Sequence, residues 1–326
     1  MSTQVAATAA TTDPAAAQRV KSRRGAAGPA GSGNGRKWLE ILLFVTPALI
    51  LMGLFVVYPI YSAARMSLFS WKGFGPMDNF VGLDNYRNVL TDEVFTDAVG
   101  HNFIIVVLSI AVQLPLGIGI ALLLNRNITG RGLLRTIIFV PYVVAEVIAG
   151  VVWLQLLQPG QGMLETLLRS VGTPTPEQGF LGTPSIALWT VFVVLTWKYL
   201  GMAVLLFLAG LQGVPHELHE AAQLDGATWW QAQRRISVPM LAPTIRTWVF
   251  LSMIGSLQLF DMVWIMTGGG PANATTTMAT YLIGQGSERQ NFGIAGAASV
   301  ILFVIGFVMA LLYQMLVLRR DTQPDR

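Results

Sequence analysis

Residues able to bind a metal or act as a nucleophile are scarce in this sequence. It has no cysteine and three histidines among 326 residues, so disulfides, thiolate metal sites and cysteine nucleophiles are excluded. His216 and His219 are three residues apart and would share one helical face, but no third ligand accompanies them. No phosphate loop of the form GxxxxGK followed by Ser or Thr occurs, since GSGNGRK at 31–37 lacks that last residue. We therefore expect no metal site and no ATP hydrolysis in this chain.

Charged side chains are few and bunched. There are 21 Lys and Arg and 17 Asp and Glu, whereas about a quarter of the residues of a soluble protein are charged. Residues 41–64, 102–125 and 290–318 contain no Asp, Glu, Lys, Arg or His. Each run can cross a bilayer core of ~30 Å, which takes about 20 helical residues. The sequence therefore predicts an all-α, polytopic membrane protein.

The charge-poor runs predict a transmembrane domain over 38–320 between two tails. The tail at 1–37 is basic and poor in apolar residues, which predicts disorder, and 321–326 form a short C-terminal tail. The six predicted spans are about 39–61, 102–124, 136–157, 186–210, 246–267 and 293–318.

Basic residues predict the orientation of these spans. With the N-terminus inside, 15 of the 21 Lys and Arg lie on the cytoplasmic side, five lie outside, and Lys198 lies within a span. The sequence therefore predicts both termini inside a prokaryotic plasma membrane. The same asymmetry explains the basic pI without nucleic acid.

The long cytoplasmic segment at 211–245 is predicted to form a helix, a turn and a second helix. Pro215 suits the first turn of a helix, and HELHEAAQL continues it. Gly226 tolerates the left-handed angles of a turn, and Asp225 can cap a second helix that begins near Ala227. Such a unit is either a rigid lever between the membrane and a soluble partner or an amphipathic surface helix.

The first of these helices offers groups for a partner. The carboxylates of Glu217 and Glu220 suit an arginine on that partner, and the small Ala221 and Ala222 allow close approach of a groove.

This loop resembles the EAA motif of permease subunits of binding-protein-dependent ABC importers. Val238 stands where Leu is usual. Nearby segments resemble the carbohydrate, MalF-like branch: LAGLQGVPHELHEAAQLDGATWWQ, FDMVWIMTGGGP and FVGLDNYRNVL. The resemblance covers about residues 38–320, and the matching motif residues are Glu220, Ala221, Ala222, Gly226, Ile236 and Pro239.

The resemblance implies a type I importer with four kinds of partner. These are a second, MalG-like permease, a dimer of ATPase subunits that binds ATP and Mg²⁺, an extracytoplasmic solute-binding protein, and a sugar substrate. Residues 217–226 would dock in a cleft of the ATPase, with Glu220 paired to a basic residue and Gly226 permitting the turn. Closure of the ATPase dimer would then drive alternating access.

Ionisable residues inside the spans are candidates for the substrate pathway, because they are costly in a membrane. Glu146, Lys198 and Asp261 qualify. Glu146 and Lys198 could instead pair and hold two spans together, and Asp261 lies close enough to a span end to be hydrated.

Polar and aromatic residues of the fourth and fifth spans suit a sugar. Ser252 and Ser256 share a helical face with Gln258 nearby, and the fourth span supplies Trp197 and Tyr199. Both serines fall where MalF-like relatives line the central site, although the relatives' Asn-rich run is here GSLQLF. Simple helix packing by small residues is the alternative.

Together these features predict a six-span permease of a sugar importer. A permease for glycerol-phosphate or polyol substrates has the same motifs. An ion-coupled secondary transporter would instead use Glu146 and Asp261 as proton or cation sites. A membrane hydrolase is disfavoured because its motifs are missing.

Overall fold

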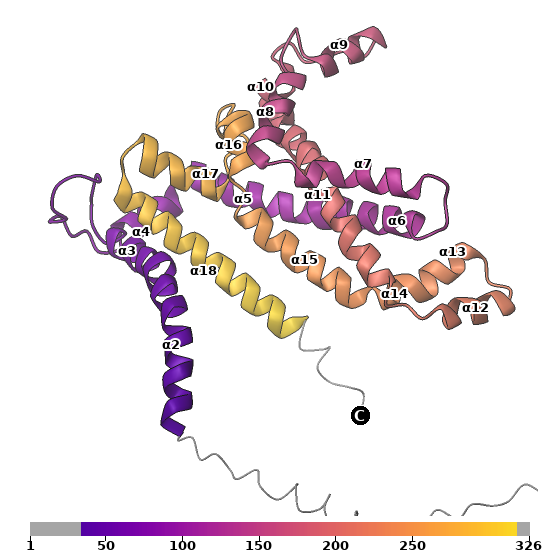
Figure 1. Cartoon of the computed structure of the whole chain (residues 1–326). Coiled ribbons are helices and arrows are strands. Elements are labelled where there is room, and N and C mark those ends of the chain that lie inside the picture. The colour runs from indigo at the N-terminus through magenta and orange to yellow at the C-terminus, as the bar shows by residue number, and fades with distance from the viewer. Residues whose placement is uncertain (1–33, 318–326) are drawn as a thin grey trace, which may run out of the picture. The chain divides into compact units, whose positions relative to one another are not determined.

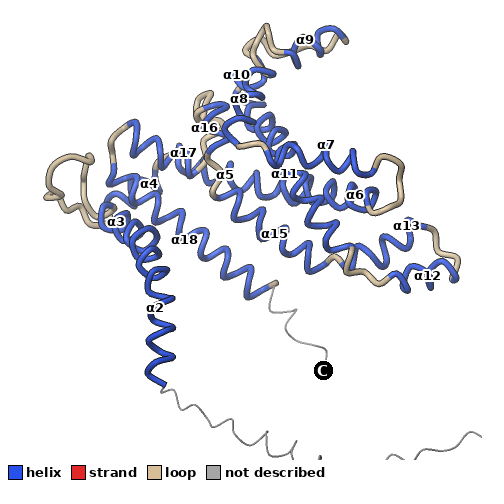
Figure 2. Tube along the Cα trace, viewed as in Figure 1, coloured by secondary structure: helices blue, strands red, loops and turns tan. Residues whose placement is uncertain are grey.

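The computed structural model describes residues 34–317, so all but the last four residues of the predicted tail at 1–37, and all of the predicted tail at 321–326, lie outside this range. Every named element of the described range is a helix (Figures 1 and 2). Within this range an isolated β-bridge joins Phe69 to Phe80. The all-α prediction is confirmed. The first helix begins at Asn34, four residues before the predicted start of the transmembrane domain.

The described residues belong to two compact units. The first ends at Pro59 and contains α2 (Asn34–Met52), the π-helical turn η1 (Gly53–Val57) and the start of α3 (Tyr58–Met66). The second begins at Ile60. After the remainder of α3 it contains α4 (Asp84–Thr91), α5 (Glu93–Leu108), η2 (Ser109–Gln113), α6 (Leu114–Leu124), α7 (Arg131–Val143), α8 (Glu146–Leu156), α9 (Met163–Ser170), α10 (Gly179–Gly182), α11 (Pro184–Leu211), α12 (His216–Leu224), α13 (Trp229–Ala232), η3 (Gln233–Ser237), α14 (Val238–Met240), α15 (Ala242–Leu257), α16 (Asp261–Thr267), α17 (Met278–Ile283), η4 (Gly284–Glu288) and α18 (Phe292–Leu316).

Four continuous helical stretches are long and apolar enough to cross a membrane. They cover Trp38–Met66, Glu93–Leu124, Pro184–Leu211 and Phe292–Leu316, and they coincide with the predicted first, second, fourth and sixth spans. The number is six if each of two bent pairs counts as one span: α7 with α8, at 100°, and the helix at Trp229–Met240 with α15, at 63°.

The third and fifth predicted spans are not continuous helices. Val144 and Ala145 have extended backbone angles, which end α7 and start α8 in a new direction. The fifth span ends as α15 at Leu257, and α16 begins only at Asp261. Hydropathy measures the length of an apolar segment and does not detect a bend, because two helices that meet at an angle are as apolar as one straight helix.

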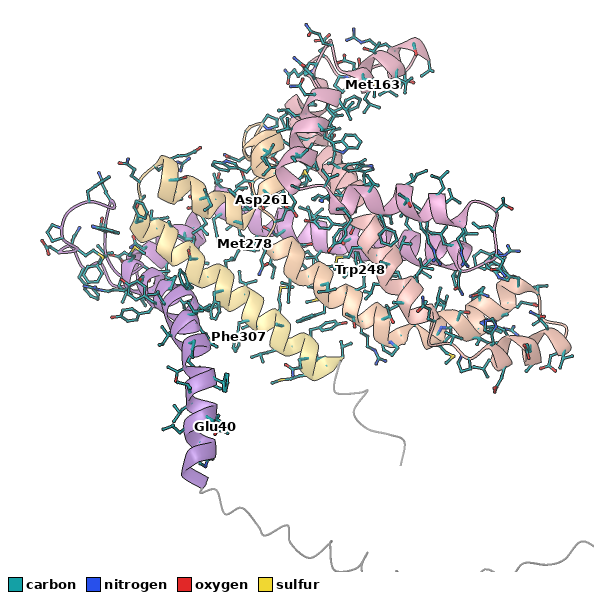
Figure 3. All side chains as sticks on the ribbon, viewed as in Figure 1. Glu40, Met163, Trp248, Asp261, Met278 and Phe307 are labelled. Atoms are coloured by element: carbon teal, nitrogen blue, oxygen red, sulfur yellow. The ribbon has the colours of Figure 1, made fainter. Side chains whose placement is uncertain are left out.

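Helix α11 supplies the centre of two of the three hydrophobic clusters in the second unit. One cluster joins it to α8 and α16 through Val191, Val194 and Met262. The other joins it to α6 and α15 through Phe207 and Trp248. Trp248 of the second cluster and Met278 of the third, both labelled in Figure 3, are buried.

Candidate functional site

The turn after α12 has the geometry of a helix C-cap. Gly226 has a φ of +77°, and the Ala227 N–H donates to the Ala222 carbonyl at 2.9 Å while the Gly226 N–H donates to Gln223 at 3.0 Å. This pattern is the Schellman motif, in which a left-handed residue lets later N–H groups satisfy the last carbonyls. The predicted stop at Gly226 therefore agrees with the backbone of the turn.

The second helix is capped by a residue other than the predicted one. Thr228 accepts from the Gln231 N–H, and the Gln231 side chain accepts from the Thr228 N–H, which is a complete capping box. Asp225 is instead the C-cap residue of α12. Gly226 and Ala227 form the turn and Thr228 is the N-cap, so the second helix begins at Trp229.

Helix α12 has two distinct faces. His219 faces the second helix, where its Nε2 lies 3.2 Å from Ser237 Oγ, and Ser237 is buried. The opposite face holds Glu217, Glu220 and Ala221, all exposed, and ends at Leu224, which is 90% exposed. Within residues 34–317, no hydrogen bond or ion pair engages the carboxylates of Glu217 and Glu220. Of the remaining loop residues, Ala222 and Ile236 are half-buried and Pro239 is exposed.

A basic residue from another loop holds the second helix in place. The guanidinium of Arg126, between α6 and α7, lies 4.9 Å from the ring centroid of Trp229, and Trp229 packs on Trp230 at 5.4 Å. Gln233 and Ser237 are buried and bonded to each other at 2.6 Å. The helix pair is therefore anchored through α13 and η3, while the outer face of α12 is left free.

A chain of polar side chains, buried except for the half-buried Thr196, connects three of the spans. Ser109 donates to Gln113 Oε1 at 2.6 Å, and its Oγ lies 3.3 Å from Ser252 Oγ, while Gln113 Nε2 donates to Thr196 at 3.2 Å. These residues come from η2, α15 and α11. Ser252 was predicted from the sequence, whereas the other three were not. Their signal was available, because Ser109 and Gln113 are polar residues inside a run without charges.

The second predicted serine belongs to a different contact. The backbone carbonyl of Ser256 accepts from the Asn102 side chain, whose Oδ1 accepts from the Met278 N–H at 2.9 Å. Asn102 is fully buried. It thus ties α5 to α15 and α17. Gln258 and Asp261, on either side of the gap between α15 and α16, are exposed.

Three consecutive residues of α11 contact α8 or the bend between α7 and α8. Trp197 packs edge-on against Trp153, with 5.4 Å between ring centroids. The Lys198 ammonium donates to the carbonyls of Pro141 at 3.1 Å, Tyr142 at 2.9 Å and Val144.

Tyr199 donates to the carboxylate of Glu146, the first residue of α8. The described contacts thus give Lys198 and Glu146 separate partners, and the salt bridge considered from the sequence is absent from the part of the chain that the structure describes.

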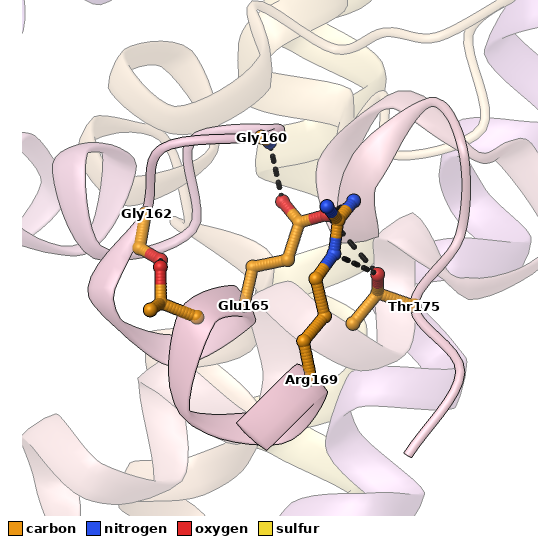
Figure 4. Close-up of polar contacts among 6 residues, drawn as sticks. Gly160, Gly162, Glu165, Arg169 and Thr175 are labelled. Atoms are coloured by element: carbon orange, nitrogen blue, oxygen red, sulfur yellow. Dashed lines mark hydrogen bonds and ion pairs between the residues drawn. The ribbon is translucent and has the colours of Figure 1, made fainter. Parts of the chain in front are cut away.

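A separate polar cluster closes the connection between α8 and α10, shown in Figure 4. Glu165 of α9 is buried and accepts from the Gly160 N–H at 2.5 Å, from Arg169 at 2.5 Å and from Thr175 at 3.1 Å. The Gly160 N–H bond, supported by Thr175 and Arg169, holds the pKa of this carboxyl below its ordinary value.

Comparison with known families matches the part of the chain that holds most of these contacts. Residues 113–322 match the family described as the binding-protein-dependent transport system inner membrane component. This segment contains α11, α12 and α15.

Curated relatives cover most of the chain. The trehalose/maltose transport permease MalF of Thermococcus litoralis is 31% identical, over 83% of this chain and 91% of its own. The sn-glycerol-3-phosphate transport permease UgpA of Agrobacterium fabrum is 34% identical, over 81% of this chain and 89% of its own.

A solved structure shares the fold. A chain in the crystal structure of a bacterial alginate ABC transporter, bound to a periplasmic protein carrying an alginate pentasaccharide, superposes with a TM-score of 0.77. It is 23% identical, and the match covers 91% of this chain and all of the other. Matches over this much of the chain argue against the two other classes considered from the sequence, an ion-coupled secondary transporter and a membrane hydrolase. The chain belongs to the family of binding-protein-dependent permeases, the membrane-embedded subunits of ABC transporters.

Proposed function

We propose that this protein is one of two permeases of an ATP-driven importer of a neutral sugar. A second permease completes the translocation pathway, an extracytoplasmic solute-binding protein delivers the substrate, and two ATPase subunits bind ATP and Mg²⁺. This chain supplies half of the pathway and binds no cofactor of its own. Alternating access follows the closure of the ATPase dimer.

The observation that supports coupling is the outer face of α12. Glu217, Glu220 and Leu224 lie on one side of this helix and are exposed, while His219 on the other side contacts Ser237. Exposed carboxylates flanking small and apolar residues suit a groove that carries a basic residue. The contact of Arg126 with Trp229 anchors the second helix, which suits a pair that transmits motion.

The orientation of the chain follows from this role. If α12 contacts an ATPase, the loop at 211–245 is cytoplasmic. Both termini are then also cytoplasmic in a six-span protein, as the distribution of Lys and Arg predicts. The membrane is the plasma membrane of a prokaryote, and α9 and the turn at Gly268–Pro271 lie on the outer side.

A neutral sugar fits the pathway better than a phosphate ester. The polar chain from Ser252 through Ser109 and Gln113 to the half-buried Thr196 offers hydroxyl and amide groups, which suit sugar hydroxyls. A phosphate needs charged or N–H-rich partners, and the three N–H groups of Lys198 already have carbonyl acceptors. Relatives named for trehalose and maltose support this choice, and the relative named for glycerol phosphate keeps the alternative testable.

The decisive experiment reverses one charge on α12. Glu220→Lys should abolish sugar uptake in cells and reduce co-purification of the ATPase, because the new ammonium would meet the basic residue that we expect in the groove. Gln223→Lys, which adds the same ammonium one turn away without removing a carboxylate, is the matched control and should retain most uptake. Full uptake by Glu220→Lys, with unchanged protein levels, would remove α12 as the docking helix.

Substrate class is tested separately. The solute-binding protein co-isolated with the complex should release a sugar when its ligand is analysed by mass spectrometry. Recovery of a glycerol phosphate would favour the second candidate.

A further inference from the structure

The bend between α7 and α8 is built around a buried positive charge. Lys198 is 3% exposed, and its ammonium has three backbone carbonyls as acceptors, from Pro141, Tyr142 and Val144. The ring of Tyr142 adds a fourth contact, at 5.8 Å from Nζ to the centroid. Since an ammonium has three N–H donors, each is used, and none remains for a substrate.

The carbonyls that surround this ammonium are those a helix leaves unsatisfied at its end. Helix α7 stops at Val143, and the extended Val144 and Ala145 prevent the following N–H groups from reaching back to its last turn. Carbonyls at a helix C-terminus also carry the negative end of the helix dipole. Within an apolar bundle such a group needs a cation or several hydrogen-bond donors.

On the α8 side of the bend, a negative charge lies at the positive end of a helix. Glu146 is the first residue of α8, so its carboxylate lies at the positive end of that helix and is held by the Tyr199 hydroxyl. Two neighbouring residues of α11, Lys198 and Tyr199, thus contact the end of α7 and the start of α8, on the two sides of the break. The bend depends on contacts from residues more than 50 positions away.

Broken helices with converging carbonyls are sites where ion-coupled carriers bind monovalent cations. We propose that the carbonyls of Pro141, Tyr142 and Val144 form a monovalent-cation site that is permanently filled by the ammonium of Lys198. The tethered cation keeps the third span bent without any dissolved ion. Removal of the side chain should open the site to ammonium or to an alkali cation of similar size.

The experiment uses the transporter purified from membranes in detergent, with all co-isolated subunits. The thermal unfolding midpoint of Lys198→Ala is measured in ammonium chloride and in choline chloride at equal ionic strength and pH. Choline is too large for the site, so the midpoint should fall by several degrees in choline and recover with a saturating dependence on ammonium. The wild type should have the same midpoint in both salts.

Two controls separate site binding from a general salt effect. Lys198→Met fills the space with an uncharged side chain, so ammonium should not raise its midpoint. Lys72→Ala removes an exposed lysine and should respond to neither salt. The proposal is overturned if Lys198→Ala is indifferent to ammonium, or if Lys198→Met responds equally.

If Lys198→Ala accumulates poorly in membranes, a second measurement still tests the proposal. Membranes carrying Lys198→Ala are then solubilised in either salt, and the yield of monodisperse protein is compared by size-exclusion chromatography. A higher yield in ammonium supports the site, and equal losses in both salts contradict it. Neither readout depends on transport, so this proposal and the proposed function fail independently.

Discussion

Two breaks between helices in this protein are held together in opposite ways. The turn from α12 to α13 is closed by bonds between near neighbours, such as the Ala227 N–H to Ala222 and the Thr228–Gln231 box. The bend from α7 to α8 is closed by Lys198 and Tyr199, which lie 53 to 57 positions away from their partners. One break folds locally, and the other exists only after α11 has packed.

This difference matches the work that each break is proposed to perform. A locally closed turn keeps its shape while the outer face of α12 remains free for another subunit. A bend held from a neighbouring span is fixed within the membrane, because moving it would strand three carbonyls and a carboxylate in an apolar environment. We expect the turn to move as a unit and the bend to stay fixed.

The largest effect on stability should come from Gly201, which lies beside the bend. A Cβ at this position would be 2.5 Å from the Ile138 carbonyl oxygen, so α11 and α7 must separate to admit it. Gly201→Ala should cost about 1–3 kcal/mol, as overpacking does, and lower the thermal midpoint of the purified complex. Gly119→Ala, where a Cβ meets nothing within 4 Å, is the matched control and should be as stable as wild type or more so. Equal midpoints for the two variants would refute close α7–α11 packing.

The corresponding change in the turn should mainly affect coupling, and it should lower the unfolding midpoint less than Gly201→Ala does. A Cβ at Gly226 meets nothing within 4 Å, but φ is +77°. Gly226→Ala therefore costs about 1–2 kcal/mol through backbone strain alone. ATP turnover stimulated by the binding protein should fall in proteoliposomes, with a smaller loss in Gly226→Asn, because Asn tolerates left-handed angles better. A loss as large with Asn as with Ala would argue against a backbone cause.

The smallest effect is expected in the connection between α8 and α10. Because the pKa of Glu165 lies below its ordinary value near 4.5, the ionised carboxylate stabilises this segment above that pH. The contribution is lost as the pH falls through the depressed pKa. Limited proteolysis should therefore cut residues 158–183 slowly at neutral pH and faster in acid.

Glu165→Gln tests the assignment of this pH dependence. The variant should be cut faster at neutral pH and lose the acid-dependent change, because the amide cannot ionise. Glu177→Gln, on an exposed residue of the same connection, should behave as wild type. Retention of the pH dependence in Glu165→Gln would assign it to another group.

Local patterns predicted the loop well and the interior poorly. Gly226 as the stop of α12 followed from residue type alone, since few residues accept its φ. The capping of the next helix was assigned to Asp225 instead of Thr228, because the length of the left-handed turn is not encoded by either residue. The contacts of Asn102, Ser109, Gln113 and Thr196 were not predicted, because a search for charged residues within the spans does not select uncharged polar ones.

The sequence by itself determined the number of apolar segments, the all-α class, the family and the turn between α12 and α13. The apolar segments and the all-α class depend on composition, the turn depends on residues close together in the chain, and the family depends on motifs that are read in linear order. Only the tertiary structure decided that the third span is bent and that Lys198 and Glu146 have separate partners. Carbonyl groups are identical in every residue, so the place where three of them converge on an ammonium cannot be read before the helices are packed.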